Sequence, residues 1–295
     1  MLRVMRAFVA VALAAAVFAA CTPKEQKIDT AAHAAEVQQW QKTRAERLQR
    51  EDGWLTLIGL HWLQDGENDV TLTKASAPHV RLTRSGAQTI LHPDPSMTVG
   101  GKPLTGDTPL LTDADANGPT IVQMGSVRFN VIKRGDRYGL RVKDAEAETR
   151  TQFKGLEYFP IDPKWRIEAR YEAYHPPKKI PITDVTGMTS DSISPGAIVF
   201  EVEGKEYRID PILEEGETDY FIIFRDATSK DATYPAGRYL YAAPPKDGKI
   251  IVDFNKAYNP PCSFTRYATC PLPPLQNRLP FRIEAGEKKY AGGHH

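Results

Sequence analysis

From about residue 54 onward, hydrophobic residues in this chain mostly alternate with polar ones, which is the pattern of half-buried β-strands. The segments with the strongest strand pattern are 126–131, 166–173, 205–209 and 249–253. Clusters of Gly, Pro, Asn and Asp interrupt them about every ten residues, as in sandwiches and barrels. No long amphipathic pattern follows Arg50 and the chain has 23 prolines, so an α/β fold is disfavoured. The pattern predicts an all-β protein.

One short helix is expected ahead of the strands. Asp29 is a favourable N-cap residue, helix-forming residues continue to about Arg50, and Gly53 provides a stop. The helix is basic and its apolar face is thin. We therefore expect it to pack on the protein as a spacer, with a position on a membrane surface as the alternative.

The strand region divides near residue 150, where a polar run at 143–150 is followed by the Pro-rich stretch 158–163. The chain is therefore expected to contain two β-sandwich or barrel-like modules preceded by the short N-terminal helix. The expected organisation is a signal peptide at 1–20, a tether and helix at 21–50, an N-terminal β-sandwich at 51–148 and a C-terminal β domain at 149–290 with a Pro-rich disulfide loop.

The first twenty residues have the pattern of a secretory signal. Arg3 and Arg6 precede an apolar run at 7–20, which is shorter than the roughly 20 residues that a membrane span needs. Cys21 directly follows two alanines and resembles the lipobox cysteine of bacterial lipoproteins. The resemblance implies lipidation at Cys21. Because Thr22 is not the Asp that retains lipoproteins at the inner membrane, we expect an outer-membrane anchor facing the periplasm, provided that the cell has two membranes.

Charge and cysteine content agree with this location. The chain has 38 basic and 37 acidic residues, and removal of Arg3 and Arg6 leaves 36 against 37. A nearly neutral chain lacks the basic surface that nucleic acid requires, so no nucleic-acid partner is expected. With Cys21 lipidated, Cys262 and Cys270 remain as an even pair, which predicts a disulfide in an oxidising compartment. Closing so short a loop stabilises by about 2–3 kcal/mol.

Common catalytic signatures are missing from the sequence. It contains no G-x-S-x-G, H-E-x-x-H, P-loop or G-x-G-x-x-G motif, and its seven histidines are scattered. No cofactor is therefore predicted. Residues 113–118 match the first half of an EF-hand loop, but Met124 stands where a bidentate Glu is needed and Pro119 follows the glycine. A polar turn explains the same residues, so no metal site is assigned, although binding by Asp113 to Asn117 stays open.

The C-terminal block has the highest density of unusual polar residues. The two-residue period places Asp253 and Asn255 on one face of a strand end, where they can point at a ligand or at an arginine. Arg238 is the expected partner, since its planar guanidinium binds a carboxylate through two bonds. The candidate ligand-binding residues are Arg238, Tyr239, Asp253, Asn255, Tyr258, Asn259, Asn277 and Glu284.

Two resemblances accompany these patterns. Segments 52–60, 237–240, 253–262 and 270–274 resemble a bacterial family catalogued as domain of unknown function 1684, over about Trp40 to Lys288. The resemblance implies a secreted or lipid-anchored protein and supplies no activity. Residues 66–68 and 98–104 resemble the outline of a forkhead-associated sandwich. That second resemblance implies a shape without a ligand, because the Arg and Ser that would grip a phosphothreonine have no clear equivalents.

These observations lead to three functional hypotheses. The preferred one is an envelope lipoprotein that binds a small polar or anionic ligand, with Arg238 as the anchor and Tyr239 or Tyr258 as the stacking face. The second is a hydrolase of an envelope glycan or related substrate that uses Asp253 and Glu284, which would need to lie about 5–10 Å apart. The third is a protein–protein interaction module that docks an envelope protein on exposed strand edges.

Overall fold

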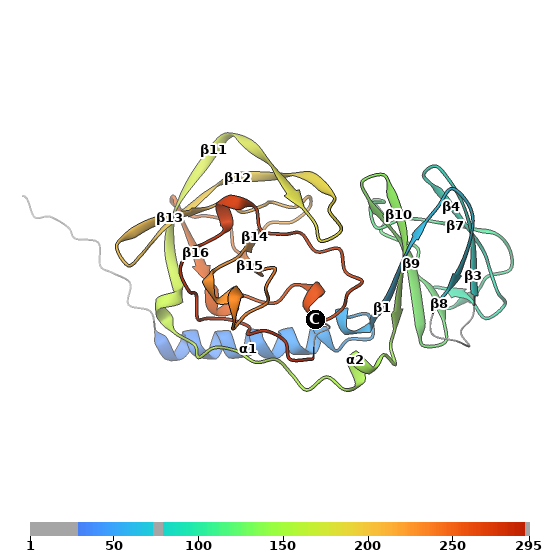
Figure 1. Ribbon diagram of the computed structural model, residues 1–295, viewed down its shortest axis with the longest axis horizontal. Coiled ribbons are helices and arrows are strands. Elements are labelled where there is room, and N and C mark those ends of the chain that lie inside the picture. The colour runs from blue at the N-terminus through green and yellow to red at the C-terminus, as the bar shows by residue number, and fades with distance from the viewer. Residues whose placement is uncertain (1–28, 73–78, 293–295) are drawn as a thin grey trace, which may run out of the picture.

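The computed structural model describes residues 29–72 and 79–292 (Figure 1). The segment 1–20 and Cys21, on which the signal-peptide and lipidation predictions depend, lie outside these residues. Helix α1 (Thr30–Leu48) begins where the sequence predicts, because the Asp29 side chain accepts hydrogen bonds of 3.1 Å from the backbone nitrogens of Ala31 and Ala32. Within the two described ranges, no helix has the length and apolar character that crossing a membrane requires.

Residues 57–144 form two antiparallel sheets. Their strands are β1 (Leu57–Leu63), β2 (Gly66–Thr71), β3 (His79–Ser85), β4 (Gln88–His92), β5 (Thr98–Val99), β6 (Lys102–Pro103), β7 (Thr108–Leu110), β8 (Val122–Met124), β9 (Val127–Arg134) and β10 (Arg137–Asp144). One sheet has the order β1-β10-β9-β8-β5-β6 and the other β2-β3-β4-β7. Alternate strand residues such as Leu82, Leu91, Phe129 and Leu140 fill the core of this N-terminal module.

The C-terminal module follows the short helix α2 (Glu148–Thr151). Its main sheet has the order β13-β12-β11-β16, and a separate pair joins β14 to β15. The strand bounds are β11 (Arg166–Thr183), β12 (Thr189–Val202), β13 (Lys205–Ile209), β14 (Tyr220–Phe224), β15 (Arg238–Ala242) and β16 (Lys249–Asp253). The short 3-10 helices are η1 (Trp54–Thr56), η2 (Pro163–Trp165), η3 (Ala227–Lys230), η4 (Phe254–Lys256), η5 (Pro261–Ser263) and η6 (Leu275–Asn277).

The prediction of an all-β fold with sandwich- or barrel-like modules and a short N-terminal helix is confirmed. The exact domain boundaries and the forkhead-associated outline stay predictions.

Helix α1 packs along the C-terminal module rather than standing apart from it (Figure 1). His33 Nε2 lies 2.8 Å from Asp253 Oδ2, and Arg44 Nε donates to Glu287 Oε1 at 2.9 Å. Val37, on the inner face of the helix, is fully buried. The N-terminal helix is therefore held by residues from the opposite end of the chain.

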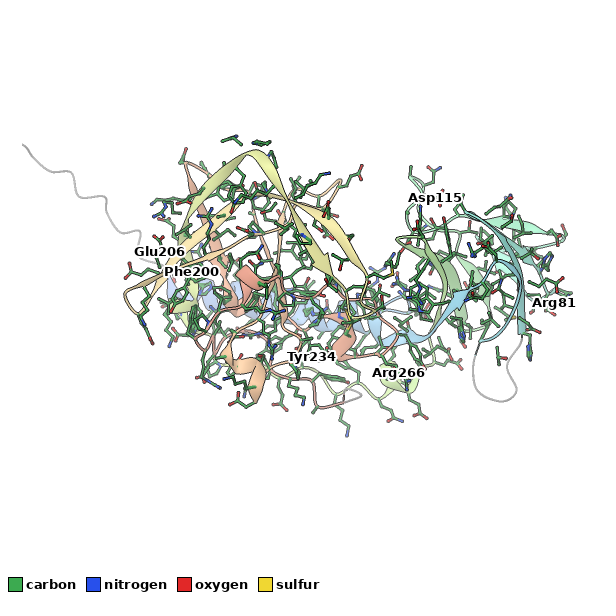
Figure 2. All side chains as sticks on the ribbon, turned by 45° about the horizontal axis from the view of Figure 1, so that its top comes forward. Arg81, Asp115, Phe200, Glu206, Tyr234 and Arg266 are labelled. Atoms are coloured by element: carbon green, nitrogen blue, oxygen red, sulfur yellow. A yellow bond between two sulfur atoms is a disulfide. The ribbon has the colours of Figure 1, made fainter. Side chains whose placement is uncertain are left out.

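The two modules meet at the disulfide loop. Cys262 and Cys270 are at disulfide distance, as predicted, with their Cα atoms 6.1 Å apart. Thr265 Oγ1 of this loop donates to Leu57 O at 2.8 Å, and Arg134 Nε donates to Thr269 Oγ1 at 3.0 Å. In Figure 2, Arg266 of the same loop lies at the junction of the modules. The loop thus contacts both β1 and β9 of the N-terminal module.

Candidate functional site

Arg238, the predicted anchor, is buried inside the C-terminal module. Its Nη2 lies 3.1 Å from Asp226 Oδ1 and donates to Ile283 O at 2.9 Å, while Nη1 donates to Ala285 O. The predicted pairing with Asp253 is wrong. Arg238 is in register with Phe224 on β14, and Asp226 follows Phe224 by two residues on the same face. Burial lowers the pKa of Arg238, and the Asp226 carboxylate opposes that shift.

Asp253 and Asn255 do lie together, but they face the protein interior. Asp253 Oδ2 pairs with His33 at 2.8 Å, and Asp253 Oδ1 accepts from Asn255 Nδ2 at 2.9 Å. Asn255 also exchanges two 3.0 Å bonds with the backbone of Asp162. Both residues are less than a tenth exposed. This cluster joins α1 to η4 and satisfies groups that the fold itself buries.

Asn259 and Asn277 are also interior residues. Asn259 Nδ2 donates to Lys288 O at 2.7 Å, whereas Asn277 Nδ2 donates to the carbonyls of Asp210 and Ile223, each at 2.9 Å.

Glu284 is exposed and accepts a 2.9 Å bond from Arg282 Nε. Because Asp253 is buried under α1, the two carboxylates of the hydrolase hypothesis lie in different environments.

Tyr239 and Tyr258, the predicted stacking residues, line a cavity of about 580 Å³. The cavity is bounded by α1, by β9 and β10 of the N-terminal module, and by the disulfide loop and β14–β15 of the C-terminal module. Its aromatic wall consists of Trp40, Trp54, Phe221, Tyr239, Tyr241 and Tyr258. Its charged residues are Arg44, Arg47, Arg134, Arg141 and Glu214. We refer to this cavity as the junction pocket.

The aromatic wall has a regular geometry. The ring centroids of Phe221 and Tyr241 are 4.9 Å apart with an interplanar angle of 25°, and those of Tyr241 and Tyr258 are 6.4 Å apart at 13°. Tyr239 stands nearly perpendicular to Phe221 and to Tyr258. Burial raises the pKa of Tyr239, Tyr241 and Tyr258, so their hydroxyls remain uncharged at neutral pH.

Two arginines of the junction pocket already have partners in the protein. Arg44 pairs with Glu287 at 2.9 Å, and its guanidinium lies 4.7 Å from the Tyr258 ring centroid. Arg134 pairs with Asp113 Oδ2 at 2.8 Å. Asp113 of the EF-hand-like loop is therefore occupied by Arg134. Asp115 of the same loop is occupied as well, because its Oδ2 accepts hydrogen bonds from the backbone nitrogen and the hydroxyl of Thr112 at 2.6 and 2.8 Å.

Arg141 and Arg47 form no ion pair with any residue of the described ranges, but Arg47 is exposed to solvent whereas Arg141 is partly buried. Arg141 lies on β10 between Leu140 and Val142, which point into the sandwich core, so its side chain is on the outer face of the sheet. Its Nε is buried without a hydrogen-bond partner, and the guanidinium lies 5.4 Å from the Trp54 ring centroid. Burial, with a contribution from Arg134, lowers the pKa of Arg141 to about 10, and the Asp113 carboxylate opposes that shift from a distance. The group is therefore charged at neutral pH, and its nearby acid Asp113 is ion-paired with Arg134 instead.

The junction pocket was not predicted from the sequence beyond its two tyrosines. Arg141, Trp54 and Glu214 each come from a different part of the chain and carry no local motif. One usable signal was present: the alternation in β10 puts Arg137 and Arg141 on the face opposite the core.

The arrangement suits the binding of an anion with an apolar body. Among the described residues that line the pocket, Glu214 is the single carboxylate and none is a histidine. Elsewhere in the described residues, no group of three or more His, Cys, Asp or Glu side chains converges as a metal site would. The pocket can thus offer positive charge and ring faces.

Comparisons with known proteins add a family but no chemistry. Residues 151–288 match the family model described as "Protein of unknown function (DUF1684)". The chain is also similar to the solution NMR structure of an uncharacterized protein from gene locus rrnAC0354 of Haloarcula marismortui. That similarity has 31% sequence identity and covers 48% of this chain and 80% of the other, with a TM-score of 0.41. No curated protein matches the chain.

Proposed function

Because residues 151–288 match the DUF1684 family model, which supplies no function, we propose the function of the chain from the junction pocket itself: it binds a small monoanion with an apolar body. The ligand lies between the two β modules, under helix α1. Its anionic group pairs with Arg141, and its body contacts the aromatic wall. The anion anchor is thus placed on the N-terminal module, away from the C-terminal network in which the sequence located it.

The observation that carries this proposal is the unpaired charge of Arg141. Withdrawing a guanidinium from water without a counter-charge costs free energy, and a folded protein retains such a group against its own stability. The pKa of Arg141 is lowered in the free protein, the direction that such a cost produces. An anion in the junction pocket would supply the missing counter-charge. Part of the binding free energy therefore comes from removing the cost of the unpaired Arg141 charge.

The size and lining of the pocket fit such a ligand. Its volume of about 580 Å³ is within the range of small-molecule sites, about 300–1,000 Å³. Arg44, Arg47 and Arg134 surround the site with positive charge, which attracts an anion even where their own partners hold them. Glu214 limits this attraction on its side of the pocket, which favours one negative charge on the ligand over two.

The proposal includes a location. The pattern of residues 1–20 and Cys21 supports an outer-membrane lipoprotein that faces the periplasm, where its ligand would be an envelope or nutrient molecule. Mass spectrometry of the mature N-terminus tests this part: we expect a diacylated or triacylated Cys21. An unmodified Cys21 in soluble protein would contradict it.

The decisive experiment compares Arg141→Gln with Arg137→Gln. Both arginines lie on the same face of β10, but Arg137 stacks on Trp62 outside the junction pocket, so it is a matched control. A fluorescent aromatic sulfonate and a panel of small carboxylates serve as probes. We expect Arg141→Gln to weaken binding by about tenfold or more, because a charge-assisted contact is lost.

The same two variants separate a binding role from a structural one. Thermal unfolding without ligand should show Arg141→Gln to be as stable as the wild type or more stable, since an unpaired charge has been removed. Equal binding by both variants, or no binding of any monoanion to the wild type, would contradict the proposal.

A further inference from the structure

We infer that the monoanion of the junction pocket is a hydroxylated aromatic acid: a flat ring with a carboxylate at one end and a hydroxyl donor at the other. This inference rests on the proposed function and names its ligand class. Three features of the pocket carry it, namely the near-parallel ring planes of the wall, the hydroxyl groups that are already engaged, and the position of Glu214.

The first feature is the orientation of the rings. Tyr241 lies within 25° of the plane of Phe221 and within 13° of the plane of Tyr258. Tyr241 is also the most open member of the wall, with 44% of its surface exposed. Parallel planes with one accessible ring favour a flat ligand ring that adopts the same orientation, because offset stacking adds to simple apolar burial. A saturated ring gains only the burial.

The second feature is that the hydroxyls of two wall tyrosines have partners. Tyr239 donates to Pro271 O at 2.8 Å, and Tyr241 donates to Glu214 Oε2 at 3.3 Å. These bonds turn the hydroxyl groups toward protein oxygens, so the tyrosines offer the ligand their rings. The wall therefore selects for the ligand's ring, while polar recognition falls to Arg141 and Glu214.

The third feature is Glu214, the carboxylate of the wall. It lies where the junction pocket meets a neighbouring cavity of about 600 Å³, which it also lines together with Arg134 and Phe221. Its bond from Tyr241 is long at 3.3 Å, so a better donor can replace or join it. A hydroxyl group of the ligand satisfies an exposed carboxylate at this place, whereas a second anionic group would be repelled.

Together these contacts describe one molecule. Arg141 comes from the N-terminal module and Glu214 from the C-terminal module. The carboxylate and the hydroxyl of the ligand therefore bind to different modules of the protein. The aromatic wall spans the space between them, with rings from α1, η1 and the C-terminal module. A ligand that carries only one polar end engages one module and leaves the other unused.

Isothermal titration calorimetry with three matched acids tests the inference: para-hydroxyphenylpropionate, phenylpropionate and cyclohexylpropionate. We expect the phenyl acid to bind about fivefold more tightly than the cyclohexyl acid through stacking. The hydroxyphenyl acid should bind about fivefold more tightly again, through one further hydrogen bond. Two exposed positions provide variants that fold. Tyr241→Leu should abolish the preference for the aromatic ring, and Glu214→Ala should abolish the preference for the hydroxyl alone.

The outcomes distinguish failure of the inference from failure of the proposed function. Equal affinities for all three acids, lost in Arg141→Gln, would overturn the ligand class and leave the anion site intact. A phenyl acid with an ammonium group that binds best, through Glu214, would overturn the hydroxyl assignment. If no acid binds, or if binding is unchanged in Arg141→Gln, both the inference and the proposed function fail.

Discussion

Arg238 and Arg141 lie on strands in different modules, the first fully buried and the second partly buried, and their surroundings differ in kind. Arg238 is enclosed by Asp226 and by backbone carbonyls of the last segment of the chain. Arg141 has an aromatic ring beside it and no acid in contact among the described residues. The first arginine is neutralised by the fold. The second is left for something outside the fold to neutralise.

The comparison shows how to distinguish structural from functional polar residues in this protein. Burial, complete for Arg238 and partial for Arg141, lowers the pKa of both arginines. The difference is whether the chain supplies the counter-charge. Where it does, as at Asp226, the residue stabilises the native state. Where it does not, the residue is a candidate for ligand contact.

The strongest test of this contrast is Arg238→Met. Removing the guanidinium leaves the Asp226 carboxylate buried without its cation, and we expect a loss of about 3–5 kcal/mol in the free energy of unfolding, measured by urea denaturation. The control is Arg282→Met, whose ion pairs with Asp231 and Glu284 are on the surface, so a much smaller loss is expected. Similar small losses in both variants would contradict the structural role of the Arg238–Asp226 pair.

A smaller loss of stability is expected when Cys262 and Cys270 are both replaced by Ser. The loop is short, so the disulfide contributes about 2–3 kcal/mol, or a Tm lower by several degrees. Because Thr269 and Pro271 of this loop line the junction pocket, ligand affinity should fall as well. The reduced wild-type protein should behave like the double variant. Unchanged stability together with complete loss of binding would show that the bond serves the site alone.

The smallest effect on the free protein is expected from pH, and it sharpens the assignment to Arg141. Ligand binding favours the charged guanidinium, whose pKa in the free protein is lowered to about 10. For phenylpropionate, which carries no phenol group that titrates, affinity should therefore be constant from near neutral pH to about pH 9 and fall as the pH rises through about 10. The tyrosines of the wall have raised pKa values and stay neutral over this interval.

The same shift has the opposite sign for stability. The unfolded chain holds the Arg141 proton more tightly than the folded one, so the penalty is present below about pH 10 and declines above it. Calorimetric titration over this interval, with Arg141→Gln as the control that lacks the effect, measures both trends. The Arg137→Gln variant should show the same pH profile as the wild type. If affinity in both proteins begins to fall well below pH 9, a group other than Arg141 causes the pH dependence.

The sequence predicted features that depend on neighbouring residues, and it did not predict contacts between segments that are far apart in the chain. A period of two identifies strands such as β9 and β16 within a few residues, and Asp29 caps α1 through its immediate neighbours. The partner of Arg238 could not be chosen that way, because Asp226 and Asp253 are equivalent until the register of β14 with β15 is known. The junction pocket was less accessible still, since α1, β10 and the disulfide loop are distant in sequence.

The placement of α1 also determines when a binding site can exist during synthesis. Asp253 follows His33 by 220 residues, and Glu287 follows Arg44 by 243. At roughly 5–20 residues per second, a ribosome needs on the order of ten seconds or more to cover that distance. The first helix of the fold thus waits for the last segment of the chain before it can dock. A nascent or truncated chain that ends before Asp253 has neither anchor for α1, so the ability to bind ligand is acquired only after Asp253 and Glu287 have been synthesised.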